Sequence, residues 1–138
     1  MTTRPWPQPE AGDVVWCHFP ELPDTAPGPK PRPALVISVL VRADGTSVKV
    51  LYGTSQGVQK LRAGEFAISK ALNPSAYALA GLSFDPKFNF KAVVELPWSE
   101  VFFKVPPRAV HGQSPKLGTL HPSLMRAAKA AHDAVAGR

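Results

Sequence analysis

An arginine between two prolines is the residue in this sequence that is best suited to phosphate chemistry. Arg32 lies in the run KPRP (residues 30–33), and its two neighbours stiffen the backbone that carries the guanidinium. Further along the chain, Thr54, Ser55 and Gln56 supply hydroxyl and amide donors. A guanidinium beside such donors can bind a phosphate and stabilise the charge that develops on it in a transition state.

A predicted β-hairpin brings these two segments together. The apolar run 34–42 indicates a central strand, the Asp-Gly pair at 44–45 is a strong hairpin turn signal, and residues 47–52 return as the second strand. Antiparallel pairing sets the beginning of the first strand beside the end of the second. We therefore expect Arg32 and Thr54 to be neighbours at one end of the sheet.

Each of these segments also has a simpler interpretation. An arginine between prolines is more often a solvated residue at the start of a strand, and a Thr-Ser-Gln run is more often ordinary turn chemistry. His18 stands at a predicted strand end, where it is either a proton shuttle or a structural residue. The hairpin alone leaves these alternatives open.

The rest of the chain predicts a mainly β fold, a small and strongly bent antiparallel barrel. Further short β-rich runs occur at 12–19, 65–69, 88–96 and 100–105. Residues 1–10 are predicted to be an extended leader. The proline cluster at 20–33 is predicted to be a long loop, because proline lacks the N–H that a helix or a central strand requires. We expect a single domain over residues 1–138.

Two helices are predicted outside the strands. Residues 73–81 have the pattern of a short inserted helix, with Asn before Pro at its start and Gly at its end. Residues 108–121 are expected to be an irregular connector. A C-terminal helix is predicted over 122–136, where apolar residues recur at helical spacing in a narrow, alanine-rich stripe.

The composition indicates a polyanionic partner. The formal net charge is +6 and the isoelectric point is near 9.8. A surplus of this size favours binding to phosphates through the release of counterions. The same charge is also compatible with a protein that is merely soluble, so it does not identify a ligand by itself.

The sequence also limits the expected cellular location of the protein and the metal sites that it can form. No apolar run is long enough to span a membrane, and the N-terminus has no apolar signal core, so we expect a cytoplasmic protein without a membrane partner. Cys17 is the only cysteine, which excludes an internal disulfide and a cysteine-built zinc site. The four histidines are isolated from one another, so no metal site is predicted.

The sequence resembles the PemK/MazF family of toxins, which pair with antitoxins. The resemblance rests on GDVVW (12–16), on the long loop that follows, on RPALV (32–36), and on a hairpin that ends in Thr54-Ser55. It covers roughly residues 1–60. It implies an SH3-like barrel of the CcdB/PemK type, a homodimer, and an endoribonuclease for single-stranded RNA that needs no metal or cofactor.

The resemblance also implies roles for individual residues. In the family reaction the ribose 2′-hydroxyl attacks the adjacent phosphate, leaving a 2′,3′-cyclic phosphate and a 5′-hydroxyl. Arg32 would act on the phosphate and in proton transfer, and Thr54 would stabilise the developing charge. Where the PemK branch carries an Arg and an Asp on a later strand, this chain departs from the pattern and has Glu95, which either replaces them as a base or is exposed to water on an alternating strand. Further side chains are assigned to RNA binding: Lys30, His18, Ser55, Gln56 and Lys60.

Two other functions remain open on the same sequence. One is a relative without catalytic activity, which either binds nucleic acid or poisons another protein, as CcdB toxins act on gyrase. The other is an SH3-like interaction protein whose proline-rich loop binds a partner domain. For the toxin, we expect the cognate antitoxin to carry an acidic tail that complements the basic surface.

Overall fold

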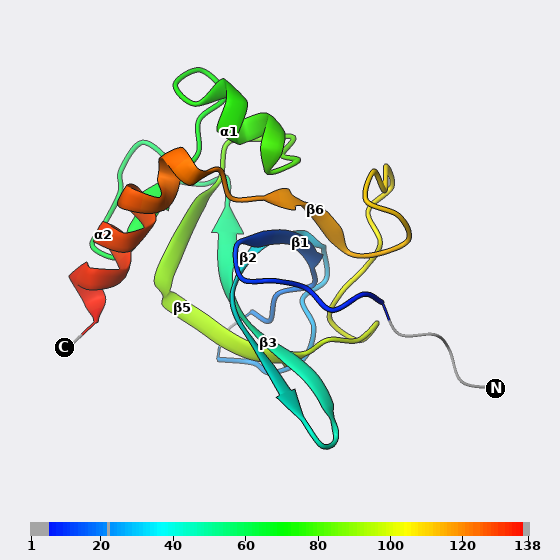
Figure 1. Ribbon diagram of the computed structural model, residues 1–138. Coiled ribbons are helices and arrows are strands. Elements are labelled where there is room, and N and C mark those ends of the chain that lie inside the picture. Colours follow the sequence, from blue (N-terminus) through cyan, green and yellow to red (C-terminus); the bar gives the residue numbers. More distant parts are fainter. Residues whose placement is uncertain (1–5, 22, 137–138) are drawn as a thin grey trace.

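The protein is built on one curved antiparallel sheet of six strands (Figure 1). The computed structural model describes residues 6–21 and 23–136. The strands are β1 (Asp13–Cys17), β2 (Arg32–Arg42), β3 (Gly45–Thr54), β4 (Glu65–Ala67), β5 (Lys87–Pro97) and β6 (Lys116–Thr119). Their order across the sheet is β4-β5-β3-β2-β1-β6, so β4 and β6 form its two edges and the sheet is open. The prediction of a mainly β fold is confirmed.

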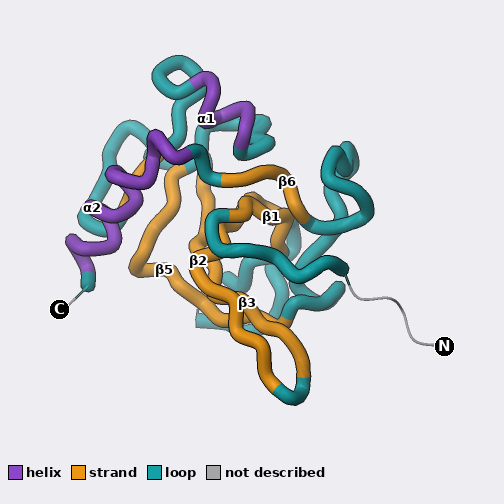
Figure 2. The backbone as a smooth tube through the Cα atoms, viewed as in Figure 1, coloured by secondary structure: helices purple, strands orange, loops and turns teal. Residues whose placement is uncertain are grey.

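The sheet is covered by apolar residues on both faces, which explains why β2 is an almost continuous apolar run. Alternate residues of a strand point to opposite faces. Leu35 and Leu51 pack on one face with buried alanines of both helices, whereas Val36 and Val50 pack on the other with Phe103. The helices α1 (Pro74–Leu79) and α2 (Met125–Val135) lie on the first face (Figure 2).

The β2–β3 hairpin forms as predicted. Arg42 pairs with Gly45 across the tight turn, and the pairing continues to Ala34 opposite Tyr52. One register shift interrupts it between Val36 and Ser38. The hairpin extends beyond the rest of the sheet at its turn, as Figure 1 shows.

Two expectations about the second half of the chain were wrong. The segment 100–105 is not a strand: the N–H groups of Phe102 and Phe103 both bond to the carbonyl of Ser99, which closes a turn, and only one bridge joins Phe103 to Cys17. The last strand, β6, lies instead inside the predicted connector 108–121 and pairs with β1. It is a short edge strand, so its sequence carries little alternation.

Segments near both ends of the chain pack against the sheet. The indole of Trp98 donates to the Pro7 carbonyl at 3.2 Å and stacks edge-on against Trp6, so the described part of the leader lies along the sheet. Residues 1–5 of the predicted leader lie outside the described residues.

The C-terminal helix is confirmed, with a 3-10 turn at Pro122–Leu124 leading into α2. No helix in the described part of the chain is long and apolar enough to cross a membrane.

Candidate functional site

The start of β2 and the end of β3 meet at one end of the sheet. Ala34 pairs with Tyr52, which is the last pair of this ladder, and Arg32 and Thr54 each lie two residues beyond it at the same end of the sheet. Gly53 allows this approach: a Cβ there would lie 2.6 Å from the Pro33 carbonyl oxygen and 2.8 Å from the ring of Phe88. Only glycine fits between them, so the local sequence holds the two strands together beside Arg32.

A third strand adds a residue that the sequence analysis missed. On the far side of β3, Thr54 pairs with Lys87 of β5. Arg32, Thr54 and Lys87 therefore lie at the same end of β2, β3 and β5, and we call these three residues a row. Arg32 lies two residues before the paired Ala34, and Thr54 two residues after its partner Tyr52, so they are on the same face of the sheet. The alternation of phenylalanines at 88 and 90 with polar residues at 87, 89 and 91 was the signal that could have identified Lys87.

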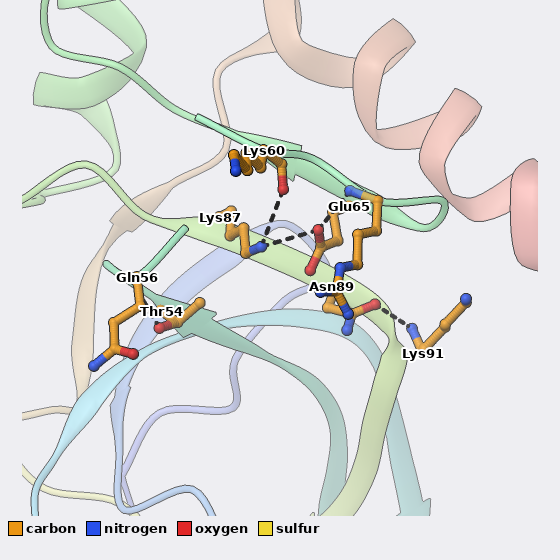
Figure 3. A network of polar contacts seen from close by, with 8 residues as sticks. Thr54, Gln56, Lys60, Glu65, Lys87, Asn89 and Lys91 are labelled. Carbon is orange, nitrogen blue, oxygen red and sulfur yellow. Dashed lines mark hydrogen bonds and ion pairs between the residues drawn. The ribbon is translucent and has the colours of Figure 1, made fainter. Parts of the chain in front are cut away.

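Lys87 is held by an almost buried carboxylate (Figure 3). Its Nζ lies 3.0 Å from Oε1 of Glu65, and the two side chains are only 11% and 8% exposed. Burial by itself would raise the pKa of Glu65, but hydrogen bonds from the Arg62 N–H, at 2.7 Å, and from Lys87 bring it below its usual value. Glu65 is therefore anionic at neutral pH and anchors the ammonium group close to the end of β3.

The turn after β3 carries three of the predicted RNA-binding residues. Ser55, Gln56 and Lys60 are all exposed there. The Thr54 hydroxyl oxygen accepts from the Gln56 N–H at 3.1 Å, so its own proton remains available to a ligand. Lys87 donates to the Lys60 carbonyl at 3.5 Å, which ties the turn to β5. Figure 3 shows Thr54, Gln56, Lys60 and Lys87 around the end of β3.

A cavity of ≈ 350 Å³ opens beside Arg32, under the proline-rich loop. Lys30 and Arg32 both line it, together with Tyr52 of β3 and Ala92 of β5. The cavity and the row of Arg32, Thr54 and Lys87 thus share one arginine. This end of the sheet offers cations, a hydroxyl donor and an open hollow within one region.

His18 has a different place from the one predicted for RNA binding. Its Nδ1 lies 2.9 Å from the Gly28 carbonyl oxygen, and the Gly28 N–H donates to the His18 carbonyl at 3.2 Å. The ring borders another hollow, with Trp6 and Phe103, and not the cavity beside Arg32. Its contacts support the structural alternative, in which His18 fastens the loop to the end of β1.

Glu95 does not share the site with Arg32 and Thr54. It pairs with Lys49, five residues before Thr54 on β3, which is roughly 17 Å along a strand. There it forms an ion pair with Arg42 and accepts from the Ser47 hydroxyl at 2.8 Å. Those two hydrogen bonds, the first from Arg42, lower the pKa of Glu95. We therefore remove Glu95 from the catalytic set.

Positive charge accumulates at the end of the sheet that holds Arg32. We call this region the basic end. Its cations come from the end of the proline-rich loop, from β2, from the segment between β3 and β4, and from β5: Lys30, Arg32, Lys60, Arg62, Lys87 and Lys91. Lys87 is neutralised by Glu65. Within residues 6–21 and 23–136, none of the ion pairs involves Arg32. A guanidinium in this position can accept a phosphate as its partner.

No protein-family model matches this chain, and no curated protein matches it. The chemistry of the basic end therefore carries the functional conclusion.

Proposed function

We propose that the basic end binds single-stranded RNA and that the protein cleaves it as a metal-independent endoribonuclease of the PemK/MazF type. The observation that carries the proposal is the row of Arg32, Thr54 and Lys87 across three neighbouring strands. It combines a guanidinium without an ion-pair partner among the described residues, a hydroxyl proton available to a ligand, and a fixed ammonium. These are the groups that bind and stabilise a phosphate whose charge is increasing.

In the proposed reaction, the ribose 2′-oxygen attacks phosphorus and gives its proton to a water molecule. The bond from phosphorus to the 5′-oxygen breaks, and that oxygen takes a proton from water, so the products are a 2′,3′-cyclic phosphate and a 5′-hydroxyl with no net change in protons. Arg32 binds the non-bridging oxygens through its planar fork of donors. Thr54 donates to the same oxygens as negative charge develops on them, and Lys87 adds a positive charge on the other side of Thr54.

The family resemblance contributes the remaining parts of the proposal. It implies an SH3-like barrel, for which the support is the strongly bent antiparallel sheet, although β4 and β6 are not paired with each other. It also implies a cytoplasmic homodimer and an antitoxin with an acidic tail. A net charge of +6 is consistent with such a partner.

The test is incubation of the purified protein with single-stranded RNA in EDTA, followed by analysis of the product ends. We expect cleavage with 2′,3′-cyclic phosphate and 5′-hydroxyl termini. The matched control is the same RNA with 2′-O-methyl groups, which has no free nucleophile and should remain intact.

Two results would contradict the proposal. Cleavage of the 2′-O-methyl RNA, or products with 5′-phosphates, would exclude attack by the 2′-hydroxyl. Binding of RNA without cleavage in any sequence would favour the non-catalytic alternative on the same fold.

A further inference from the structure

The cavity under the proline-rich loop has the shape and lining of a site for one nucleobase. It is an open hollow of ≈ 350 Å³ between the loop, β3 and β5. Its nine lining residues are Phe19, Pro20, Glu21, Gly28, Pro29, Lys30, Arg32, Tyr52 and Ala92. Most of these are apolar or aromatic, and a few are charged, which is the usual composition of a small-molecule site. Because Arg32 lies on its wall, a base in the cavity would be adjacent to the phosphate that Arg32 binds.

The loop that forms the roof is fastened in place before any ligand arrives. The reciprocal contacts between His18 and Gly28 join its far end to β1. Gly28 approaches β1 so closely that a Cβ would lie 2.3 Å from the Phe19 carbonyl oxygen. The prolines at 20, 23, 27, 29 and 31 remove further backbone freedom. A preformed site of this kind loses little entropy when it binds a ligand.

One wall of the cavity is aromatic. Tyr52 is partly exposed there, and its ring is backed by Phe19 with 5.0 Å between centroids and an interplanar angle of 43°. Unpaired bases in RNA stack on exposed aromatic rings of this kind, and the contact is tolerant of sequence. Stacking on Tyr52 would therefore favour an unpaired base without selecting which one.

Selection would come from the charged residues of the lining. Glu21 supplies the carboxylate of the cavity, and Lys30 and Arg32 supply cations. Guanine is the base whose Watson–Crick edge presents two adjacent donors, N1–H and the N2 amino group, and a carboxylate can accept both. Its O6 and N7 atoms are acceptors that suit a lysine or arginine. Adenine and cytosine each offer one amino group, and uracil offers one imide N–H.

We infer that this cavity binds one unpaired guanine of the RNA, next to the phosphate held by Arg32. Tyr52 stacks on the base, Glu21 accepts from its Watson–Crick edge, and Lys30 donates to its acceptor edge. This inference rests on the proposed function, because it assigns the base selectivity of the same RNA site.

The experiment measures binding rather than cleavage. Four short 2′-O-methyl oligonucleotides that differ at one position, with G, A, C or U in a background of U, are titrated by fluorescence anisotropy. We expect the G oligonucleotide to bind about tenfold more tightly than the others, within the range for one bidentate pair. Glu21→Gln should abolish this preference. Asp24→Asn removes the same charge from the same loop outside the cavity lining, and it should retain the preference.

A second pair of variants separates stacking from selection. Tyr52→Ala should weaken binding of all four oligonucleotides about equally, whereas Glu21→Gln should weaken binding of the G oligonucleotide alone. Thermal unfolding of each variant verifies that the fold is retained.

Failure of this inference is distinguishable from failure of the proposed function. Equal affinity for all four oligonucleotides, or a G preference that survives Glu21→Gln, would overturn the guanine site even if the protein cleaves RNA. A Glu21-dependent G preference in a protein that cleaves no RNA would support the base site and contradict the nuclease.

Discussion

An arginine faces a hydroxyl residue at both ends of the β2–β3 hairpin, but the two ends differ in where the acid lies. At the turn, Arg42 donates to the Ser47 hydroxyl at 3.0 Å, and Glu95 of β5 pairs with both. At the basic end, Arg32 and Thr54 lie at the same end of β2 and β3, and the nearby acid, Glu65, is engaged with Lys87 instead.

The two ends therefore differ in whether the arginine has an ion-pair partner among the described residues. The Arg42 cluster is already neutral, and it is exposed, so it contributes to the surface of the hairpin. The acid at the basic end neutralises a lysine and leaves the charge of Arg32 for a ligand. The position of the carboxylate, and not the arginine–hydroxyl pair itself, separates the two ends.

The largest expected effect is on the rate of RNA cleavage, and it is tested by substituting each of the two arginines. Arg32→Ala removes the guanidinium from the proposed phosphate site and should lower the single-turnover rate of RNA cleavage roughly 10²- to 10³-fold. Arg42→Ala removes an equal charge from the turn end and should change the rate by less than about twofold. Equal losses in both variants would show that only the total charge matters.

The second prediction concerns the stability of the basic end. Glu65→Gln leaves the Lys87 ammonium without its partner in an environment where the side chain is only 11% exposed. We expect the free energy of unfolding in urea to fall by about 2–3 kcal/mol, toward the lower end of values for a buried pair that loses one partner. Glu95→Gln breaks an exposed pair and should leave the urea midpoint almost unchanged. The reverse order would contradict the burial of the Glu65–Lys87 pair.

The third prediction is the pH dependence of that difference. The pKa of Glu65 is lower in the folded protein than its usual value. Its contribution to stability is therefore fully present above the pKa of the unfolded chain, and it is lost as pH falls through the folded pKa. The urea stabilities of the unsubstituted protein and Glu65→Gln should converge between neutral pH and roughly pH 3. A gap that is independent of pH would mean that Glu65 acts through packing alone.

The smallest expected effect concerns the salt dependence of RNA binding at the two ends of the hairpin. Lys60→Gln removes one exposed cation from the basic end, so the slope of log affinity for single-stranded RNA against log salt should decrease in magnitude by about 0.7. Lys49→Gln, which lies opposite Glu95, should leave the slope unchanged. A similar change for both lysines would indicate that RNA contacts the two ends alike.

The sequence was sufficient to predict the contact between β2 and β3. An apolar run, an Asp-Gly turn and a polar end determine the hairpin, and counting from the turn places Arg32 near Thr54. The C-terminal helix was also predictable, because its apolar stripe recurs at helical spacing. Both predictions depend on short-range patterns.

The place of β5 was not predictable in the same way. Leu51 pairs with Val93 and Gly53 with Phe88, so four residues of β5 stand opposite Tyr52 alone. With Glu95 opposite Lys49, an uninterrupted register would place Lys87 three residues beyond Thr54, opposite residue 57. The irregularity brings Lys87 back to Thr54, and no periodic pattern in the sequence reveals it. Lys87 was missed for that reason. Glu95 was assigned from the family resemblance and not from a strand register, and the structure places it beside Arg42 and Ser47 instead.

The most direct test of the account is to map the contact of RNA on the labelled protein by NMR. A 2′-O-methyl oligonucleotide, which the proposed reaction cannot cleave, is titrated while the backbone amide signals are followed. The account predicts that the signals of Gly53, Thr54, Gln56 and Lys87 shift, and that those of Arg42 to Ser47 do not. Shifts confined to the hairpin turn or to α2, with the basic end unchanged, would contradict it.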